Sequence, residues 1–236
     1  MVLPEAVVLV EDMRAMEHRE QESACPASTA ASTERSAIMF RAVDMLGASA
    51  GLLLAAPIML AAAVSVWLTM GAPVLFRQRR LGRYERPFTL LKFRTMRPAN
   101  GQEFSPSERL TRTGRLLRQL SIDELPQLWN VLKGEMSLVG PRPLYPEYLP
   151  YYTLRERRRH LVRPGITGLA QVSGRNRSHW DDRLELDVHY VAHKSLALDL
   201  WIILKTFAKV LRRSDVMERA IQGSLVKHRQ KQRPLL

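Results

Sequence analysis

The chain has 236 residues, of which 46% are hydrophobic and 25% charged, a composition that excludes a disordered protein. Residues 1–36 hold three arginines against seven acidic residues, whereas the rest of the chain holds 33 basic against 16 acidic residues. The strongly basic part of the chain after residue 36 is expected to attract anions such as nucleic acid, anionic lipid or a phosphorylated substrate. The single cysteine, Cys25, excludes an intrachain disulfide and a cysteine-based metal site.

Residues 1–36 are predicted to form a disordered tail. The stretch at residues 25–33 is small, polar and rich in turn-forming side chains. A weakly apolar run at residues 6–10 has no basic residue before it, so it lacks the form of a secretory signal.

An uncharged segment spans residues 45–76. As a helix it would be about 48 Å long, whereas a bilayer core needs only about 20 residues. The segment is therefore too long for one simple span and too short for two. Pro57 lies near its middle and is expected to break or kink the helix there.

The flanking charges favour a path that enters the membrane and returns. Basic residues lie on both sides of the segment: Arg35, Arg41, Arg77, Arg79, Arg80, Arg83 and Arg86. Positive charge at both ends places both ends on the cytoplasmic side. We therefore predict a re-entrant membrane helix at residues 37–76, broken near Pro57. One tilted transmembrane helix and a buried helical hairpin of a soluble protein are the alternatives.

Several elements are expected after the membrane segment. The strand-like residues 73–76 and 88–94 predict a β-hairpin. Beyond it, the pattern indicates a basic helix at residues 109–119, a charged helix at 145–163 and a turn at 163–168.

Residues 196–213 are predicted to form an amphipathic helix. Its apolar side chains are Leu200, Ile203, Leu204, Phe207, Val210 and Leu211, and its basic ones are Lys205, Lys209, Arg212 and Arg213. Such a helix can lie at an anionic membrane interface or pack on a protein core, and the sequence favours neither. The basic C-terminal tail, residues 216–236, is able to touch lipid headgroups.

Asp123 and Glu124 begin a predicted helix that ends at Gly134. Ser121 and Glu124 have the spacing of a capping box, which would be a purely structural role. Alternatively, the helix N-terminus keeps both carboxylates ionised and attracts phosphate. One carboxylate would then be a nucleophile and its neighbour a ligand of Mg²⁺.

Candidate anion-binding side chains occur elsewhere in the chain. Arg142 lies between two prolines, which fix the backbone that aims its guanidinium. Lys92 and Arg94 are two positions apart on one predicted strand and so share a face. Arg175 is a further candidate. Carboxylates expected to pair with the many arginines are Glu185 and Asp187.

Several motifs, in this order, resemble the bacterial polyprenyl-phosphate sugar-phosphate transferases, which are monotopic phosphoglycosyl transferases. The similarity covers about residues 37–215. The residues that carry it are PVLF at 73–76 with Gln78, KFRTM at 92–96, DELPQL at 123–128, SLVGPRP at 137–143, RPGITGLAQVSGR at 163–175, and LD at 186–187 with Tyr190.

The resemblance implies a two-step reaction. Asp123 would attack the β-phosphate of a UDP-sugar and release UMP, and the phosphosugar would then pass to undecaprenyl phosphate. Asp123 and Glu124 would hold Mg²⁺, the expected cofactor. Substrate and phosphate would be bound by Lys92, Arg94, Arg142, Arg175 and Asp187.

The resemblance also implies a location and partners. The protein would act at the cytoplasmic face of the bacterial inner membrane, with both termini cytoplasmic. It would start exopolysaccharide, O-antigen or glycoprotein-glycan assembly. Inner-membrane lipids are expected partners, nucleic acid is not, and a homodimer is left open. Residues 145–150 resemble small members that use N-acetylated amino-deoxy sugars. Ala56 departs from the serine common before the membrane proline, which removes a hydroxyl from the bend.

The expected fold is α+β and mostly helical, with the re-entrant helix, a small β-hairpin and amphipathic interfacial helices. The domains would be the tail at 1–36, the membrane helix at 37–76, a cytoplasmic catalytic domain at 77–215 and the basic tail at 216–236.

Two other functions compete with the membrane enzyme. A nucleic-acid-binding protein would explain the basic body but not the apolar segment, and the arginines lack interleaved aromatic residues. A non-catalytic membrane scaffold of a polysaccharide pathway is the second alternative. The intact residues Asp123, Glu124, Lys92 and Arg142 argue against it.

Overall fold

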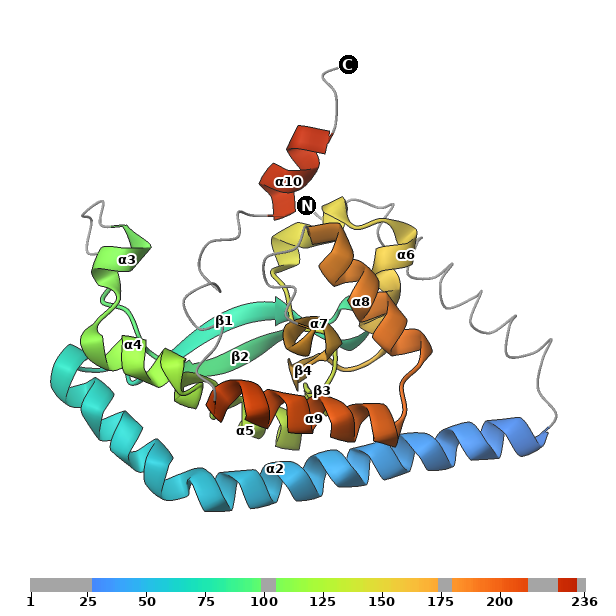
Figure 1. Ribbon diagram of the computed structural model, residues 1–236, viewed down its shortest axis with the longest axis horizontal. Coiled ribbons are helices and arrows are strands. Elements are labelled where there is room, and N and C mark those ends of the chain that lie inside the picture. Colours follow the sequence, from blue (N-terminus) through green and yellow to red (C-terminus); the bar gives the residue numbers. More distant parts are fainter. Residues whose placement is uncertain (1–26, 99–104, 174–179, 212–224, 233–236) are drawn as a thin grey trace. The chain divides into compact units, whose positions relative to one another are not determined.

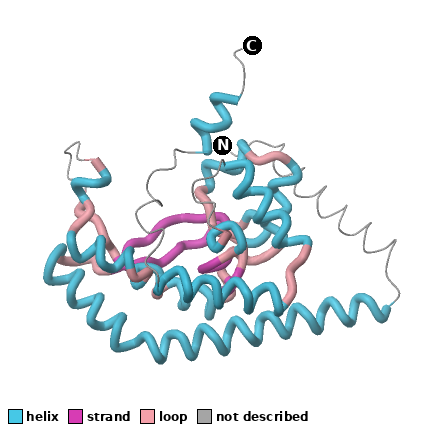
Figure 2. Tube along the Cα trace, in the orientation of Figure 1, coloured by secondary structure: helices cyan, strands magenta, loops and turns pink. Residues whose placement is uncertain are grey.

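The computed structural model describes residues 27–98, 105–173, 180–211 and 225–232. Helices predominate around short strands, as the predicted α+β, mostly helical class requires (Figures 1 and 2). The chain divides into two compact units, Met1–Val43 and Asp44–Leu236. Of the predicted N-terminal tail, residues 1–26 lie outside the described ranges. The contacts reported below all lie within the second unit.

Helix α2 (Ala27–Met70) covers residues 37–70 of the predicted membrane segment, which was expected to extend to residue 76. By length and composition its residues Ala37–Met70 are sufficient to cross a membrane. Leucines at 46, 53, 54, 60 and 68 are exposed, and so many exposed apolar side chains indicate a lipid environment rather than water. The chain thus has the long apolar N-terminal helix that the sequence predicted.

The predicted break at Pro57 is not seen, because α2 continues through this residue. Figure 1 shows the helix axis changing direction within the C-terminal half of α2, the half that contains Pro57. A proline inside a helix removes one backbone hydrogen bond and bends the axis without ending the helix when its neighbours hold it.

The part of α2 that belongs to the second unit, from Asp44 onward, also packs on the rest of that unit. Ala48 lies in a buried cluster with Leu90 and Met136. Val66, farther along the helix, packs with Phe93 and the residues around it. One side of α2 therefore belongs to the protein core while the leucines of the other side remain exposed.

The predicted hairpin is present. Strand β1 (Leu75–Leu81) pairs antiparallel with β2 (Pro87–Phe93), and the short helix η1 (Arg83–Glu85) connects them. Helix α5 (Gln127–Lys133) packs on β2. The fully buried Asn130 of α5 donates to Thr89 O (2.8 Å) and accepts from Leu91 N (3.1 Å). This side chain satisfies backbone groups on the outer edge of β2.

A second strand pair replaces the predicted turn at residues 163–168. Strand β4 (Gly165–Thr167) pairs in parallel with β3 (Ser137–Val139). The two backbones approach so closely that a Cβ at Gly165 would lie 2.1 Å from Gly140 N. Only glycine fits there, which explains a Gly-rich sequence that resembles a turn.

Residues 145–163 form three short helical pieces rather than the single charged helix that was predicted. These are η3 (Pro146–Tyr151), α6 (Leu154–Arg157) and η4 (Arg158–Leu161). Pro150 restricts the first piece, and Thr153 begins the second with a capping box to Glu156.

The C-terminal helices complete the core. Helices α7 (Leu169–Val172) and α8 (Trp180–Ala192) contact each other, and α7 also contacts α9 (Leu196–Leu211). The predicted amphipathic helix is therefore confirmed. Its buried Ile202 packs against Val139 and Tyr190, while Leu204 and Phe207 on its other side are exposed. One side of α9 thus packs on the core, and another side exposes apolar residues, so the helix has features of both alternatives that the sequence left open.

The remaining elements are short. The predicted basic helix at residues 109–119 appears as α3 (Pro106–Arg109) and α4 (Arg112–Gln119). Within the predicted C-terminal tail the structure describes α10 (Leu225–Gln232), whose Leu225 is fully buried against the cluster around Tyr148.

Buried His160 makes the stability of the fold dependent on pH. Burial, together with the positive charge of Arg159, lowers the pKa of its imidazole to about 3. The unfolded chain takes up this proton near pH 6.5, whereas the folded chain does not until about pH 3. We therefore expect His160 to reduce the free energy of unfolding as pH falls from about 6.5, by about 1.4 kcal/mol per pH unit.

Urea unfolding of detergent-solubilised protein between pH 7 and pH 4.5 measures this effect. In His160→Gln the decline should be shallower by one proton, because glutamine does not titrate in this range. The exposed His189 provides the control, and His189→Gln should leave the slope unchanged. Equal slopes for His160→Gln and the unmodified protein would contradict the prediction.

Candidate active site

The two adjacent carboxylates lie on the 3-10 turn η2 (Ile122–Glu124), between α4 and α5. Asp123 and Glu124 are both buried, with 6% and 7% of their surface exposed. The predicted capping box is wrong. Ser121 has a left-handed backbone (φ 56°) and its side chain caps nothing, because the α-helix begins later, at Gln127. The predicted helix end at Gly134 is confirmed, with φ 83°.

Two predicted cations converge on Glu124. Lys92 Nζ and Arg142 Nη2 each lie 2.9 Å from the same oxygen, Glu124 Oε1. Strand β2 supplies Lys92, and the loop after β3 supplies Arg142. Three segments that are far apart in sequence thus meet at one carboxylate oxygen.

The two cations respond differently to this shared anion. The charge of Glu124 raises the pKa of Arg142, so this guanidinium stays charged. Burial lowers the pKa of Lys92 more than Glu124 raises it. Glu124 therefore holds both side chains in place through charge-assisted hydrogen bonds.

The loop that carries Arg142 is fixed from behind by a buried ion pair. Arg159 Nη2 donates to Arg142 O (2.7 Å) and to Asp187 Oδ2 (2.7 Å). Asp187 was predicted both as a salt-bridge partner and as a substrate-binding residue, and the structure places it in the first role. Arg159 is 2% exposed, and its position in a run of arginines gave no signal that it would be buried.

Strand β3, which leads into this loop, is held on both sides. Asp44 of α2 accepts from Ser137 Oγ (2.8 Å) and from Leu138 N (2.9 Å). The Tyr190 hydroxyl lies 3.2 Å from Val139 O and donates to Asp199 at 2.7 Å. The backbone before Arg142 therefore has little freedom to move.

Arg94 does not join the carboxylate cluster, although it was predicted to share an anion-binding face with Lys92. Its guanidinium donates to the carbonyls of Met70, Gly71 and, at 3.2 Å, Ala72. These carbonyls end α2, where a cation offsets the helix dipole and satisfies free acceptors. Arg175, another predicted anion ligand, lies outside the described residues.

A second group beside the cluster was not anticipated from the sequence. The Arg80 guanidinium lies 3.6 Å from the ring centroid of Tyr145, and it donates to Gln78 Oε1 at 2.6 Å. The spacing of Gln78 and Arg80 could have revealed this group. Both residues lie on the same face of β1 as Phe76, which pairs with Lys92 across the hairpin.

The carboxylates fit the expected Mg²⁺ in one specific way. Among the residues that the structure describes, no group of three His, Cys, Asp or Glu side chains could enclose a metal ion. Mg²⁺, however, is commonly held by one or two carboxylates together with substrate phosphates. Asp123 and Glu124 offer such an incomplete set.

Comparisons with known proteins identify the family of the chain. The family model described as bacterial sugar transferase matches residues 35–213. The uncharacterized sugar transferase EpsL of Bacillus subtilis is 52% identical over 177 residues, which is 74% of this chain and 88% of that protein. The UDP-glucose:undecaprenyl-phosphate glucose-1-phosphate transferase of Caulobacter vibrioides is 42% identical over 72% of this chain and 69% of its own length.

A third relative is longer than this chain. The UDP-N-acetylgalactosamine-undecaprenyl-phosphate N-acetylgalactosaminephosphotransferase of Aeromonas hydrophila is 40% identical over 190 residues, which is 74% of this chain but 44% of that protein. The matched region contains α2 from residue 35 onward, both strand pairs and the carboxylate turn. The resemblance drawn from the motifs is confirmed, and the chain belongs to the bacterial sugar transferase family.

Proposed function

We propose that this protein transfers a sugar 1-phosphate from a UDP-sugar to undecaprenyl phosphate and releases UMP. This would be the first membrane step in assembling an exopolysaccharide or a related glycan. The observation that carries the proposal is the buried Asp123–Glu124 pair, in which Lys92 and Arg142 share one oxygen of Glu124. The names of the Caulobacter and Aeromonas relatives support the reaction class.

Asp123 is the proposed nucleophile. Its carboxylate oxygen would attack the β-phosphorus of the UDP-sugar, and the bond from that phosphorus to the bridging oxygen would break as UMP leaves. A phosphate oxygen of undecaprenyl phosphate would then attack the same phosphorus and release Asp123. Glu124 is committed to two cations, so its neighbour is the better candidate for attack.

Lys92 and Arg142 would stabilise the charge that develops on the transferred phosphoryl group. Such transfer depends mainly on positioning and on fixed positive charge. The Arg159–Asp187 pair holds the backbone of Arg142, so the guanidinium needs little rearrangement when substrate binds. Asp123 and Glu124 would hold Mg²⁺, which would neutralise part of the diphosphate charge.

The membrane arrangement follows from α2 and its flanks. We propose that α2 enters the inner membrane from the cytoplasmic side and returns, with the bend in its second half at the deepest point. The exposed leucines of α2 and the exposed apolar face of α9 support this arrangement. Both would place the catalytic domain against the lipid surface.

The role of Asp123 predicts that Asp123→Asn loses turnover by about a thousandfold or more, because an amide is a poor nucleophile. The measurement is UMP release by purified protein with undecaprenyl phosphate, Mg²⁺ and a panel of UDP-sugars. The panel includes N-acetylated amino-deoxy sugars, which residues 145–150 favour.

The matched control is Asp182→Asn, which changes an exposed aspartate and should keep full activity. Thermal unfolding of Asp123→Asn should stay close to that of the unmodified protein. Mass spectrometry after incubation with the donor alone should find the phosphosugar on the peptide containing Asp123. Normal turnover by Asp123→Asn would remove this residue as the nucleophile.

The re-entrant path predicts that both ends of the chain are cytoplasmic. Cys25, which precedes α2, is the chain's single cysteine and reports on the N-terminal side. A Cys25→Ser variant with a cysteine added after Leu236 reports on the other side. We expect an impermeant maleimide to label either cysteine only after the inner membrane is opened. Labelling of one end in intact spheroplasts would establish a spanning helix instead.

A further inference from the structure

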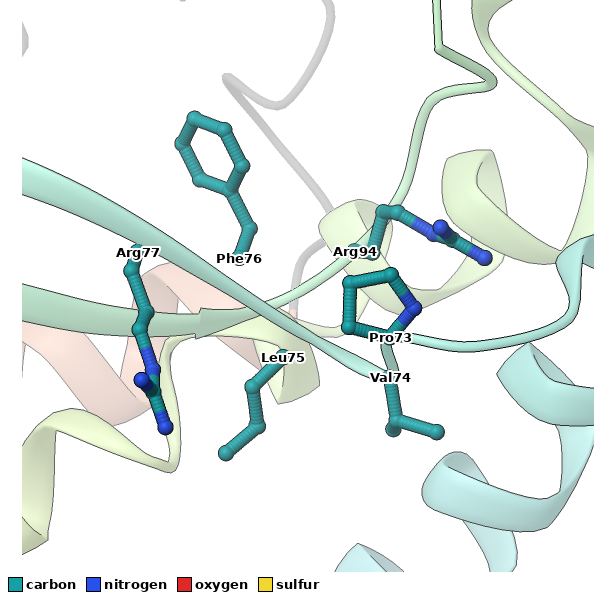
Figure 3. Close-up of a pocket in the computed structure, with 6 residues that line it drawn as sticks. All are labelled: Pro73, Val74, Leu75, Phe76, Arg77 and Arg94. Atoms are coloured by element: carbon teal, nitrogen blue, oxygen red, sulfur yellow. The ribbon is translucent and has the colours of Figure 1, made fainter.

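An apolar groove lies where α2 passes into the hairpin. A cavity of about 590 Å³ is lined by Pro73, Val74, Leu75, Phe76, Arg77 and Arg94 (Figure 3). Figure 3 shows Phe76 and Arg77 projecting from opposite sides of β1, as successive residues of a strand do. The groove therefore follows the edge of β1 and is reached from both faces of the strand.

The apolar wall of this groove is well supported. Val74 and Leu75, which line the groove, pack on a buried cluster that includes Phe93 and Leu117. Phe76, by contrast, is 45% exposed. An aromatic side chain left in the open beside a supported apolar wall is typical of a surface that takes up an apolar ligand.

Phe76 connects the lining of the groove with the face of the hairpin that carries Lys92. Phe76 lies opposite Lys92 in the register of the hairpin, and residues paired in this way have neighbouring side chains on one face. Lys92 Nζ in turn lies 2.9 Å from Glu124 Oε1. A molecule resting on Phe76 would therefore have its next polar group beside Lys92.

Around the groove, uncharged residues are followed along the chain by basic residues, as the apolar chain of a lipid phosphate is followed by its anionic group. Residues 45–76 carry no charge, and the exposed Arg77 is the first charged side chain after them. Arg77 thus marks the level at which the apolar zone gives way to phosphate groups. An apolar chain that ends in a phosphate matches the uncharged residues 73–76 followed by Lys92, which lies on the same face of the hairpin as Phe76. Arg77 lies on the opposite face.

We propose that this groove binds the first isoprene units of the polyprenyl phosphate acceptor and directs its phosphate toward Lys92. The inference rests on the proposed function and adds where the acceptor enters. A cavity of this size accommodates a ligand of moderate length, so the rest of the long chain would remain in the membrane beside α2.

The test separates the two halves of the reaction. Phe76→Ser should raise the KM for undecaprenyl phosphate about tenfold, because an apolar contact is lost, whereas the burst of UMP released without acceptor should keep its amplitude. Phe76→Leu, which remains apolar, should restore most of the affinity. Leu154→Ser removes an apolar side chain that is 66% exposed on α6 and should not change the acceptor KM.

Two arginines of one strand give a second comparison. Arg77→Gln should raise the acceptor KM more than Arg79→Gln, since Arg79 is also exposed but does not line the groove. A polyprenyl phosphate that carries a diazirine on its first isoprene should crosslink to residues 73–77. Undecaprenyl phosphate should compete for this labelling, and phosphatidylglycerol should not.

Each opposing result has a distinct meaning. An unchanged acceptor KM in Phe76→Ser would overturn the groove proposal while leaving the reaction in place. If phosphatidylglycerol competed as well as undecaprenyl phosphate, the groove would be an ordinary lipid contact and the proposal would also be overturned. The same conclusion would follow if Phe76→Ser lost binding to phosphatidylglycerol vesicles to the same extent as it lost affinity for the acceptor. Absence of a UMP burst in the unmodified protein with every donor would instead count against the proposed function.

Discussion

One carboxylate oxygen organises the catalytic part of this molecule. Glu124 Oε1 accepts from Lys92 and from Arg142, each at 2.9 Å, and so joins the hairpin, the carboxylate turn and the loop after β3. A buried anion with a single partner would be costly, as would two buried cations without an anion. Together with the neighbouring Asp123, whose charge also acts on both cations, the two carboxylates balance Lys92 and Arg142. This balance allows a strongly charged centre to persist inside a small domain.

The buried charged residues around this centre are likewise paired with groups of opposite charge or with backbone groups. Arg159 binds Asp187 and the carbonyl of Arg142, and Asp44 binds the strand that precedes the same loop. Arg159, Asp187 and Asp44 each have a defined partner, which favours one arrangement of the loop that carries Arg142. Binding energy from a substrate is then available for the reaction instead of for ordering the site.

Local patterns predicted the local elements well. Strand alternation identified the hairpin, the uncharged run identified α2, and helical periodicity identified α9. The failures involve contacts between distant residues. The pairing of β3 with β4 joins segments nearly thirty residues apart, and the charges at 145–163 suggested one exposed helix although Arg157 and His160 are buried. Within the site, the sequence singled out Lys92, Arg142 and Glu124 but did not predict that the two cations share one oxygen of Glu124. Arg94 instead binds the end of α2, because three carbonyls there need donors.

The pairing of Asp44 with Ser137 and Leu138 also bears on how the protein is made. The ribosome delivers Asp44 more than ninety residues before its partners, so this carboxylate lacks them until β3 has been synthesised. The hydrogen bonds that attach the start of the apolar segment to β3 can therefore form only after most of the helix and the hairpin have been made. A long-range contact of this kind joins helix α2 to the strand that leads into the loop that carries Arg142.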